Sequence, residues 1–331
     1  MNTPTGSLDL IEEPKPAPGT GQVLVRVEAN SLNARDQMIL GDPDGAGATS
    51  HARIPLSDGA GVVEAVGDAV TRFEPGARVA GSFHPTWFGG PRRARGPAYG
   101  VGLDGWLTEY VVIDQQALVA VPDHLTIEEA ATLPCAAVTA WSAIKGVGPG
   151  DTVLVQGTGG VSLFATQLAR VCGARVIATT SNPDNTARLQ DLGVSDVINY
   201  RESPRWGADV VAVTAGRGVD RIVEVGGPGT LAESVAALAY GGRISLVGHL
   251  SKTNGALEPM ALFSKGGAIT SIAVGSRSDF EDMNRVLAQH EIRPLISAVF
   301  DFEKAGDAFA HFSRGPRFGK VVIRHRTGPR S

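Results

Sequence analysis

The stretch from about residue 150 to residue 275 constrains the fold most, because short apolar runs alternate there with segments of helical spacing. TVLVQG (152–157) and RVIATT (175–180) are continuous apolar runs, and SLFATQLARVCG (162–173) lies between them with helical periodicity. Strands that are apolar throughout are typical of a parallel sheet covered on both faces. The alternation continues to AITSIAVG (268–275) and predicts a doubly wound α/β domain with six parallel strands.

The first third of the chain has a different texture. QVLVRVEA (22–29) alternates apolar and polar residues, as a half-buried strand should, and further short strands follow between Gly, Pro and Asp turns. Thr126 and Glu129 have the spacing of a capping box that opens a helix. The last residues, with two helices and two strands, could return to this β-rich part. We therefore expect a β-rich domain from residues 1–121 and 276–331, and an α/β domain from 122–275.

Composition excludes several classes of protein. Of 331 residues, 43% are hydrophobic and 19% charged, with a net charge of −4, which indicates a globular protein without a basic surface for nucleic acid or anionic lipid. No run approaches the length of a membrane span, and the first residues lack the pattern of a signal peptide. Two cysteines cannot form a disulfide framework, so we expect a cytoplasmic protein.

The turn after the first apolar run of the α/β domain has the composition of a phosphate cradle. In VLVQGTGGVSLF (153–164), glycines allow a tight turn and close approach of a pyrophosphate to the helix that follows. The third glycine of the usual dinucleotide fingerprint is replaced by serine. Within six alternating units the turn predicts a Rossmann fold that binds a dinucleotide through Gly157, Gly159, Gly160, Val161 and Ser162.

The end of the second strand bears on which dinucleotide is bound. NAD-binding proteins place an acidic residue there to accept from the ribose 2′-hydroxyl, but this chain has Thr180 and Ser181. Small polar residues leave room for a 2′-phosphate. Arg188 could pair with that phosphate, or it could be a solvated helix residue. The pattern favours NADP(H) over NAD(H).

Five segments together resemble the medium-chain dehydrogenase/reductase superfamily, and more narrowly its zinc-independent branch of quinone oxidoreductases and alcohol dehydrogenase-like proteins. The resemblance implies a GroES-like catalytic domain beside the Rossmann domain, and it covers nearly the whole chain. The segments are SLNARD (31–36), IPLSDGAGVVEAVG (54–67), LPCAAVTAW (133–141), VLVQGTGGVS (153–162) and RFGKVVI (317–323).

The same resemblance places the three catalytic zinc ligands of zinc-dependent relatives at Asn33, Asp58 and Cys135. A catalytic zinc site needs three thiolate, imidazole or carboxylate ligands, and a neutral amide is a poor one. We therefore expect no zinc, and expect Cys135 to be a small buried hydrophobe rather than a ligand or a nucleophile.

Without a metal, reduction of a conjugated acceptor is easier than oxidation of a simple alcohol, because conjugation spreads the developing charge onto a carbonyl oxygen. The expected activity is therefore NADPH-dependent hydride transfer to an enone, an enal or a quinone. Alternatives are a zinc-free alcohol dehydrogenase-like enzyme, a non-redox cyclase or isomerase on the same scaffold, and a dinucleotide-binding protein without turnover.

The resemblance also implies roles for individual residues. Asn33 would orient the substrate carbonyl or the cofactor, or would instead cap the helix that follows it. Asp36 would lie beside it, and His249 would be a proton donor or a pocket wall. Further cofactor contacts are implied at Thr139, Tyr200, Gly248, Val274, Gly319 and Lys320, although Lys320 could be only a charge at a strand edge.

Aromatic residues suggest the walls of a substrate pocket for a flat or polycyclic small molecule. Equally, they could be ordinary core or loop residues. The expected pocket residues are Asp58, His84, Trp87, Phe88 and Trp106. We also expect a homodimer, formed by edge pairing of AITSIAVG (268–275).

Overall fold

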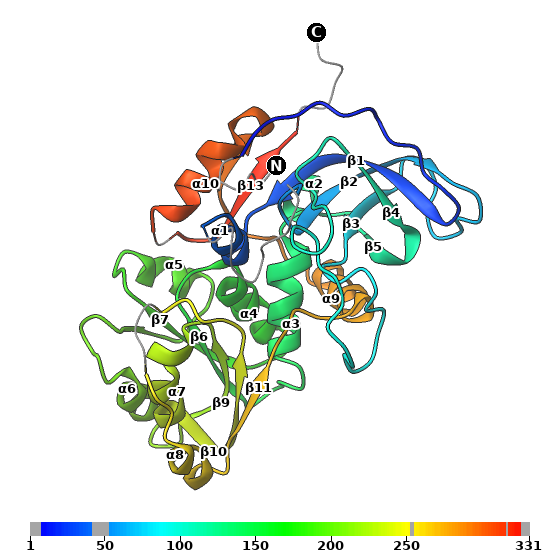
Figure 1. Cartoon of the computed structure of the whole chain (residues 1–331). Helices are drawn as coiled ribbons and strands as arrows, with labels where there is room; N and C mark the ends of the chain where they lie inside the picture. The colour runs from blue at the N-terminus through cyan, green and yellow to red at the C-terminus, as the bar shows by residue number, and fades with distance from the viewer. Residues whose placement is uncertain (1–7, 42–52, 252–254, 316, 326–331) are drawn as a thin grey trace. The chain divides into compact units, whose positions relative to one another are not determined.

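The computed structural model describes residues 8–41, 53–251, 255–315 and 317–325. The chain divides into two compact units, Met1–Val138 with Val274–Ser331, and Thr139–Ala273. Figure 1 shows the elements of both units. Throughout the described ranges, no helix is long and apolar enough to cross a membrane.

The second unit is built on a six-stranded sheet in which every strand pair is parallel, as its continuous apolar runs predict. The strands lie in the order β11-β10-β9-β6-β7-β8. Helix α4 packs on β6 and β7, while α6 and α7 pack on each other. The strands are β6 (Thr152–Gln156), β7 (Arg175–Thr180), β8 (Asp196–Asn199), β9 (Val219–Glu224), β10 (Leu238–Leu246) and β11 (Ala268–Ser271). The helices are α3 (Val138–Ala143), which begins one residue before this unit, α4 (Gly160–Val171), α5 (Asn185–Asp191), α6 (Trp206–Val213), α7 (Leu231–Ala237) and α8 (Pro259–Ser264).

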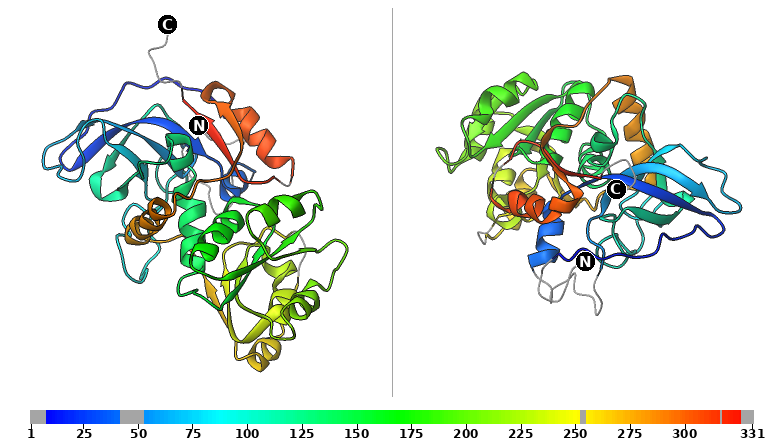
Figure 2. Two further views of the ribbon diagram at one scale, coloured as in Figure 1. Left: turned by 180° about the vertical axis from the view of Figure 1, so that it is seen from behind. Right: turned by 90° about the horizontal axis from the view of Figure 1, so that it is seen from above.

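The first unit is built on a seven-stranded sheet with the order β12-β13-β1-β2-β3-β5, in which β4 also pairs with β1. The last strand, β13, pairs antiparallel with the first, β1, and Figure 2 shows the red strand beside the blue one. The strands are β1 (Gln22–Ser31), β2 (Asp58–Val66), β3 (Arg78–Gly81), β4 (Tyr110–Asp114), β5 (Leu118–Ala120), β12 (Ile296–Asp301) and β13 (Lys320–Arg324). The helices are α1 (Ala34–Gly41), α2 (Ile127–Ala130), α9 (Arg277–Gln289) and α10 (Ala305–Ser313).

The boundary between the units differs from the one expected after residue 121. Helix α2 packs on β1 and β2, and the single π-helical turn Leu133–Ala137 packs on β2 and β3, so residues 122–138 group with the first unit. The predicted capping box is confirmed: the Thr126 side chain accepts from the Glu129 N–H at 3.1 Å, and the Glu129 carboxylate accepts from the Thr126 N–H at 2.8 Å.

A buried histidine lies at the end of β13. His325 Nε2 lies 2.6 Å from Asn30 Oδ1, whose own amide nitrogen donates to the carbonyl oxygens of Asp58 and Trp106. Because Oδ1 must accept, the imidazole carries a proton on Nε2. The ring stacks on Phe302 with centroids 4.4 Å apart. Burial lowers the pKa of His325 to about 3.

This histidine predicts a loss of stability in mild acid. In the unfolded chain the pKa is about 6.5, so below that pH only the unfolded state gains the proton. The free energy of unfolding falls by about 1.4 kcal/mol per pH unit as the pH drops from about 6.5 toward the folded pKa. Denaturant titrations of the wild type should therefore show about 2 kcal/mol more loss between about pH 7 and pH 5 than those of His325→Gln. Parallel curves for the two proteins would contradict the neutral, buried assignment.

Candidate functional site

The turn after β6 has the open geometry that a bound pyrophosphate needs. Gly157 adopts φ 72°, a left-handed conformation that favours glycine, and Gly159 is the N-cap of the long helix α4. Among the described residues, no side chain caps this helix, and no atom lies within 4 Å of where a Cβ on Gly157 or Gly159 would stand. Free N–H groups at a helix N-terminus, with open space in front of them, fit a dinucleotide phosphate.

Ser162 explains how the fold tolerates the loss of the third glycine. Its side chain is buried, and its hydroxyl donates to the Gln156 carbonyl oxygen at 2.6 Å. The hydrogen bond holds the first turn of α4 against the end of β6. The serine therefore replaces close glycine packing by a polar contact, and Gly160 and Val161 remain at the start of the helix.

Glu224 is a central residue of this region that the sequence argument missed. It ends β9, its side chain is fully buried, and it accepts from Gln156 Nε2 at 2.7 Å and from Thr230 Oγ1 at 2.6 Å. The N–H groups of Gly226 and Gly227 donate to it at 2.8 and 2.9 Å. The carboxylate thus ties the ends of β6 and β9 together. The sequence feature that could have revealed it is an acidic residue at the end of an apolar strand, at the start of the segment EVGG (224–227).

The residues expected beside the adenosine ribose lie at the ends of two neighbouring strands. Thr180 ends β7, and its carbonyl oxygen accepts from the N–H of Tyr200, which follows β8, at 3.1 Å. Ser181 is half-buried, and Arg188 lies on the exposed face of α5. Thr180 Oγ1 accepts from the Asn182 N–H at 3.2 Å, so its hydroxyl shapes the turn. The structure thus brings Thr180, Ser181 and Tyr200 together on one edge.

The other three expected residues of the second unit differ from one another in burial and in position. Thr139 is buried in α3, and His249 is exposed in the segment after β10. Gly248 lies against the Val225 carbonyl, where a Cβ would stand 2.9 Å from the oxygen. The ends of β9 and β10 therefore approach each other at a glycine.

Val274 and Gly319, also expected near the cofactor, belong to the first unit. Val274 adopts φ 64°, an uncommon conformation for a β-branched residue. Gly319 adopts φ 112°, and a Cβ there would stand 2.3 Å from the Leu295 carbonyl oxygen. Only glycine fits at position 319, whatever else the residue contacts.

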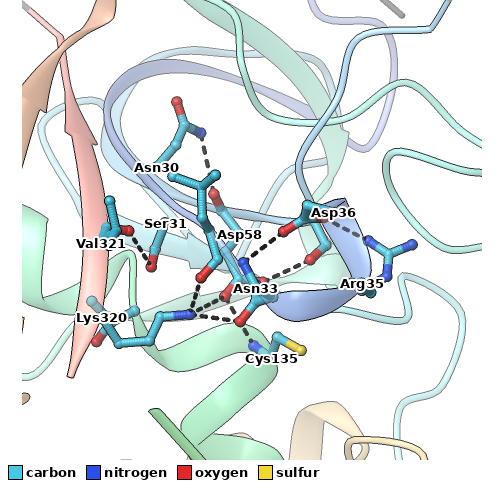
Figure 3. Close-up of polar contacts among 12 residues, drawn as sticks. Asn30, Ser31, Asn33, Arg35, Asp36, Asp58, Cys135, Lys320 and Val321 are labelled. Atoms are coloured by element: carbon cyan, nitrogen blue, oxygen red, sulfur yellow. Dashed lines mark hydrogen bonds and ion pairs between the residues drawn. The ribbon is translucent and has the colours of Figure 1, made fainter. Parts of the chain in front are cut away.

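A buried polar cluster of the first unit joins four segments (Figure 3). Asn33 precedes α1, Asp58 begins β2, Cys135 lies in the π-helical turn, and Lys320 begins β13. The Lys320 ammonium donates to Asn33 Oδ1 at 2.6 Å and to the Leu32 carbonyl at 2.8 Å. Its distance to Asp58 Oδ2 is 3.8 Å. We call Asn33, Asp58, Cys135 and Lys320 the donor cluster.

The contacts of the donor cluster favour an ion pair between Asp58 and Lys320. Asp58 Oδ1 accepts from the Ser57 hydroxyl at 2.8 Å and Oδ2 accepts from the Cys135 N–H at 3.3 Å, so both oxygens act as acceptors. The Lys320 ammonium faces only oxygens. Burial raises the pKa of Asp58 and lowers that of Lys320, and the charge of each partner opposes the shift of the other. Lys320 is therefore a buried internal cation and not a charge at an exposed strand edge.

Asn33 does not use its side chain to cap α1. Its backbone N–H donates to Asp36 Oδ2 at 2.8 Å, which is the reverse half of a capping box. Its side-chain Oδ1 is engaged by Lys320, and its Nδ2 has no hydrogen-bond partner within the described part of the chain. Burial raises the pKa of Asp36 to about 6; the charge of Asp58 adds to this shift and Arg35 opposes it.

The donor cluster does not fit a zinc ion. A cation at this place would meet the Lys320 ammonium, and Asn33 offers only a neutral amide. Cys135 is half-buried rather than a core residue as expected, and burial and the Asp58 charge raise the pKa of its thiol above the ordinary value. Such a thiol is neither a ready thiolate ligand nor a nucleophile. Over the described ranges, no group of three His, Cys, Asp or Glu side chains could hold a metal ion.

The prediction that Trp106 lines the substrate pocket is wrong. Its ring is fully buried in the first unit's core with Val25, Val79 and Leu118. A Cβ on Gly59 or Gly81 would stand within 2.3 Å of this ring, so the indole fills the space that two glycines leave. Trp106 therefore packs in the core of the first unit and does not line a pocket.

The other aromatic residues lie in the loop after β3. His84 is buried, with its ring 5.9 Å from that of Trp87, and Phe88 is exposed. The carbonyls of Trp87 and Phe88 accept from the first N–H groups of α9, at 2.9 and 3.0 Å, which fixes the loop. Phe88 also borders a separate hollow of about 1290 Å³, lined mainly by residues 8–16 and 103–114.

Comparison with known proteins supports the resemblance. A family model described as the alcohol dehydrogenase GroES-like domain matches residues 19–123, and one described as zinc-binding dehydrogenase matches residues 160–289. A zinc-type alcohol dehydrogenase-like protein of Schizosaccharomyces pombe is 38% identical over 315 residues, covering 92% of this chain and 91% of that protein. The quinone oxidoreductase of Sus scrofa is 29% identical over 328 residues, covering 93% and 90%. A solved structure from Sinorhizobium meliloti is 40% identical, with a TM-score of 0.90 and coverage of 96% and 95%.

A glycine-rich dinucleotide turn in one unit and a GroES-like sheet in the other define a two-unit oxidoreductase. The chain belongs to the medium-chain dehydrogenase/reductase superfamily, as its sequence segments indicated.

Metal removal provides a test of the donor cluster. Because an ammonium already occupies it, dialysis against EDTA should leave the melting temperature unchanged, and elemental analysis of the purified protein should find zinc far below one equivalent. Dialysis against buffer alone is the control. Stoichiometric zinc, or a melting temperature that falls with EDTA and recovers with added zinc, would overturn this assignment.

Proposed function

We propose that the protein is an NADPH-dependent reductase that delivers hydride to the activated C=C bond of an enone or enal, or to a quinone. One observation carries the proposal: the donor cluster combines hydrogen-bond donors with an internal ammonium whose chemistry does not suit a metal. The glycine turn before α4 supports it, because its open helix N-terminus suits the pyrophosphate of a hydride carrier.

The expected chemistry follows from the charge that develops. NADPH held by the glycine turn before α4 would supply the hydride; an enone or enal would gain it at the β-carbon and a proton at the α-carbon. Between these steps negative charge spreads onto the carbonyl oxygen, where a preorganised N–H donor stabilises it. In this proposal Gly157, Gly159 and Ser162 position the carrier, and Asn33 supplies the donor. His249 and Asp36 are the candidate proton donors.

The proposed preference for NADP(H) rests on the residues at the end of β7. Thr180 and Ser181 stand where an acidic side chain would repel a 2′-phosphate, and Tyr200 lies directly beside Thr180. Arg188, exposed on the adjacent helix α5, is the proposed partner of the phosphate. Thr139, Gly248, Val274 and Gly319 remain proposed cofactor-side residues.

The proposed substrate is a small molecule with a flat conjugated face, for which His84, Trp87 and Phe88 offer aromatic contacts and Asp58 a polar one.

We also propose a cytoplasmic homodimer. Both described cysteines are free, and β11 pairs only with β10 among the described strands, leaving its other edge for a second copy.

A substrate panel tests the proposed reaction. The protein is incubated with NADPH and a series of quinones, cyclic enones, enals and simple ketones, and consumption is followed at the nicotinamide absorbance band. We expect turnover with quinones or enones and little with simple ketones. Turnover confined to ketones and alcohols would indicate alcohol dehydrogenase-like chemistry. Binding of NADPH without consumption by any member of the panel would indicate a non-redox or non-catalytic protein.

Substitution of Arg188 tests the cofactor preference. Arg188→Ala should weaken NADPH binding about ten- to a hundredfold and leave NADH binding nearly unchanged, because only NADPH carries the 2′-phosphate. Affinities are measured by nicotinamide fluorescence. The matched control is Arg243→Ala, an exposed arginine of β10 that pairs in register with Arg221 of β9. Equal losses for both nucleotides would remove Arg188 from the phosphate site.

A further inference from the structure

The side-chain amide of Asn33 uses its oxygen in a hydrogen bond but not its nitrogen. The residue is only 8% exposed, and its Oδ1 accepts from Lys320 at 2.6 Å. Its Nδ2 is buried and makes no hydrogen bond of standard geometry in the described residues, although the Asn33 side chain interacts with the Asp58 carboxylate and lowers its pKa. An unsatisfied buried donor is costly, so a native protein that keeps one has a reason to do so. The free N–H therefore points to an acceptor that arrives with a ligand.

The position of the ammonium relative to its neighbours is the second observation. Lys320 Nζ lies at hydrogen-bond distance from Asn33 Oδ1, but 3.8 Å from the nearer oxygen of Asp58. The cation is thus bonded to the amide and only balanced by the carboxylate. The carboxylate itself is held by Ser57 and by the Cys135 N–H. This arrangement holds the positive charge of Lys320 next to the Asn33 amide.

A positive charge on the amide oxygen changes the other end of the same amide. The amide group is conjugated, so a cation at Oδ1 draws electrons from nitrogen and makes the N–H protons better donors. In a buried site this effect is screened little by solvent. Lys320 therefore acts on anything that Nδ2 contacts without contacting it directly.

We propose that Lys320 is a positioning residue that fixes and polarises the Asn33 amide, so that Nδ2 donates to the carbonyl oxygen on which charge develops during hydride transfer. The proposal rests on the proposed function. It assigns the cofactor-side lysine of the sequence argument to the substrate carbonyl instead. The proton taken up at the α-carbon comes from another group, and Lys320 keeps its protons throughout.

Three variants distinguish polarisation of the Asn33 amide from a purely structural role of the Lys320–Asp58 ion pair. Lys320→Met removes the cation and leaves Asp58 buried without its balancing charge. Lys320→Met combined with Asp58→Asn removes both charges and so avoids an unpaired buried carboxylate. Asp58→Asn alone keeps the ammonium on the Asn33 amide. Each is assayed with NADPH and the quinone or enone that the wild type reduces best.

The proposal predicts an asymmetric result. Both proteins that lack Lys320 should lose at least about tenfold in kcat with KM and NADPH affinity nearly unchanged, whereas Asp58→Asn, which keeps the ammonium on the Asn33 amide, should lose several-fold less in kcat than either of them, whatever it loses in KM. Asn33→Ala should lose about a hundredfold in kcat. Recovery of activity in the double variant, or an equal loss in Asp58→Asn, would show that the ion pair is only structural. A loss confined to NADPH affinity would place Asn33 and Lys320 at the cofactor.

A measurement without turnover separates this inference from the proposed function. In asparagine-labelled protein, the Asn33 side-chain amide resonances are assigned from Asn33→Gln. The amide protons should lie downfield in the wild type and Asp58→Asn relative to the charge-free double variant. Coincident resonances in all three proteins would overturn the polarisation, even if the enzyme is a reductase. If no acceptor in the panel is reduced, the proposed function fails, and the resonances still decide whether Lys320 polarises Asn33.

Discussion

The hydrogen bond between the Lys320 ammonium and the Asn33 amide is the interaction on which the first unit depends. It joins residues 287 positions apart, at the start of the last strand and just before the first helix. A buried ammonium is costly unless its protons are satisfied, and here the Leu32 carbonyl, the Asn33 amide and the Asp58 carboxylate surround it. The C-terminal strand must therefore return to β1, and the donor cluster forms only when it does.

The donor cluster also determines which kind of developing charge the protein can stabilise. Its cation is covalently part of the chain and acts through an amide, so it can stabilise a charge that is already delocalised better than a localised alkoxide. The second unit contributes an open glycine turn, in which Ser162 and Glu224 hold the strand ends in place. A delocalised charge on the acceptor and a hydride carrier together favour conjugated substrates. This is the physical reason for proposing an enone or quinone reductase within the superfamily.

Local patterns predicted most of the fold, and long-range contacts explain most of what they missed. The parallel strands, the capping box at Thr126 and the glycine turn depend on periodicity and spacing, which a sequence shows directly. Trp106 looked like a pocket wall because no pattern shows that Gly59 and Gly81 make room for its ring. The ammonium in the donor cluster and the buried Glu224 were missed for the same reason, since each is defined by partners far away in the chain.

Transfer of deuterium from NADPH deuterated at the nicotinamide C4, one position at a time, tests the central claim most directly. A cyclic enone is the acceptor, and the position of the label in the product is determined by mass spectrometry and NMR. The account predicts one deuterium at the former β-carbon, delivered from one face of the nicotinamide, with the carbonyl intact. Deuterium at the carbonyl carbon would contradict it, since the protein would then reduce an isolated carbonyl. A product without deuterium from both labelled forms of NADPH would contradict hydride transfer altogether.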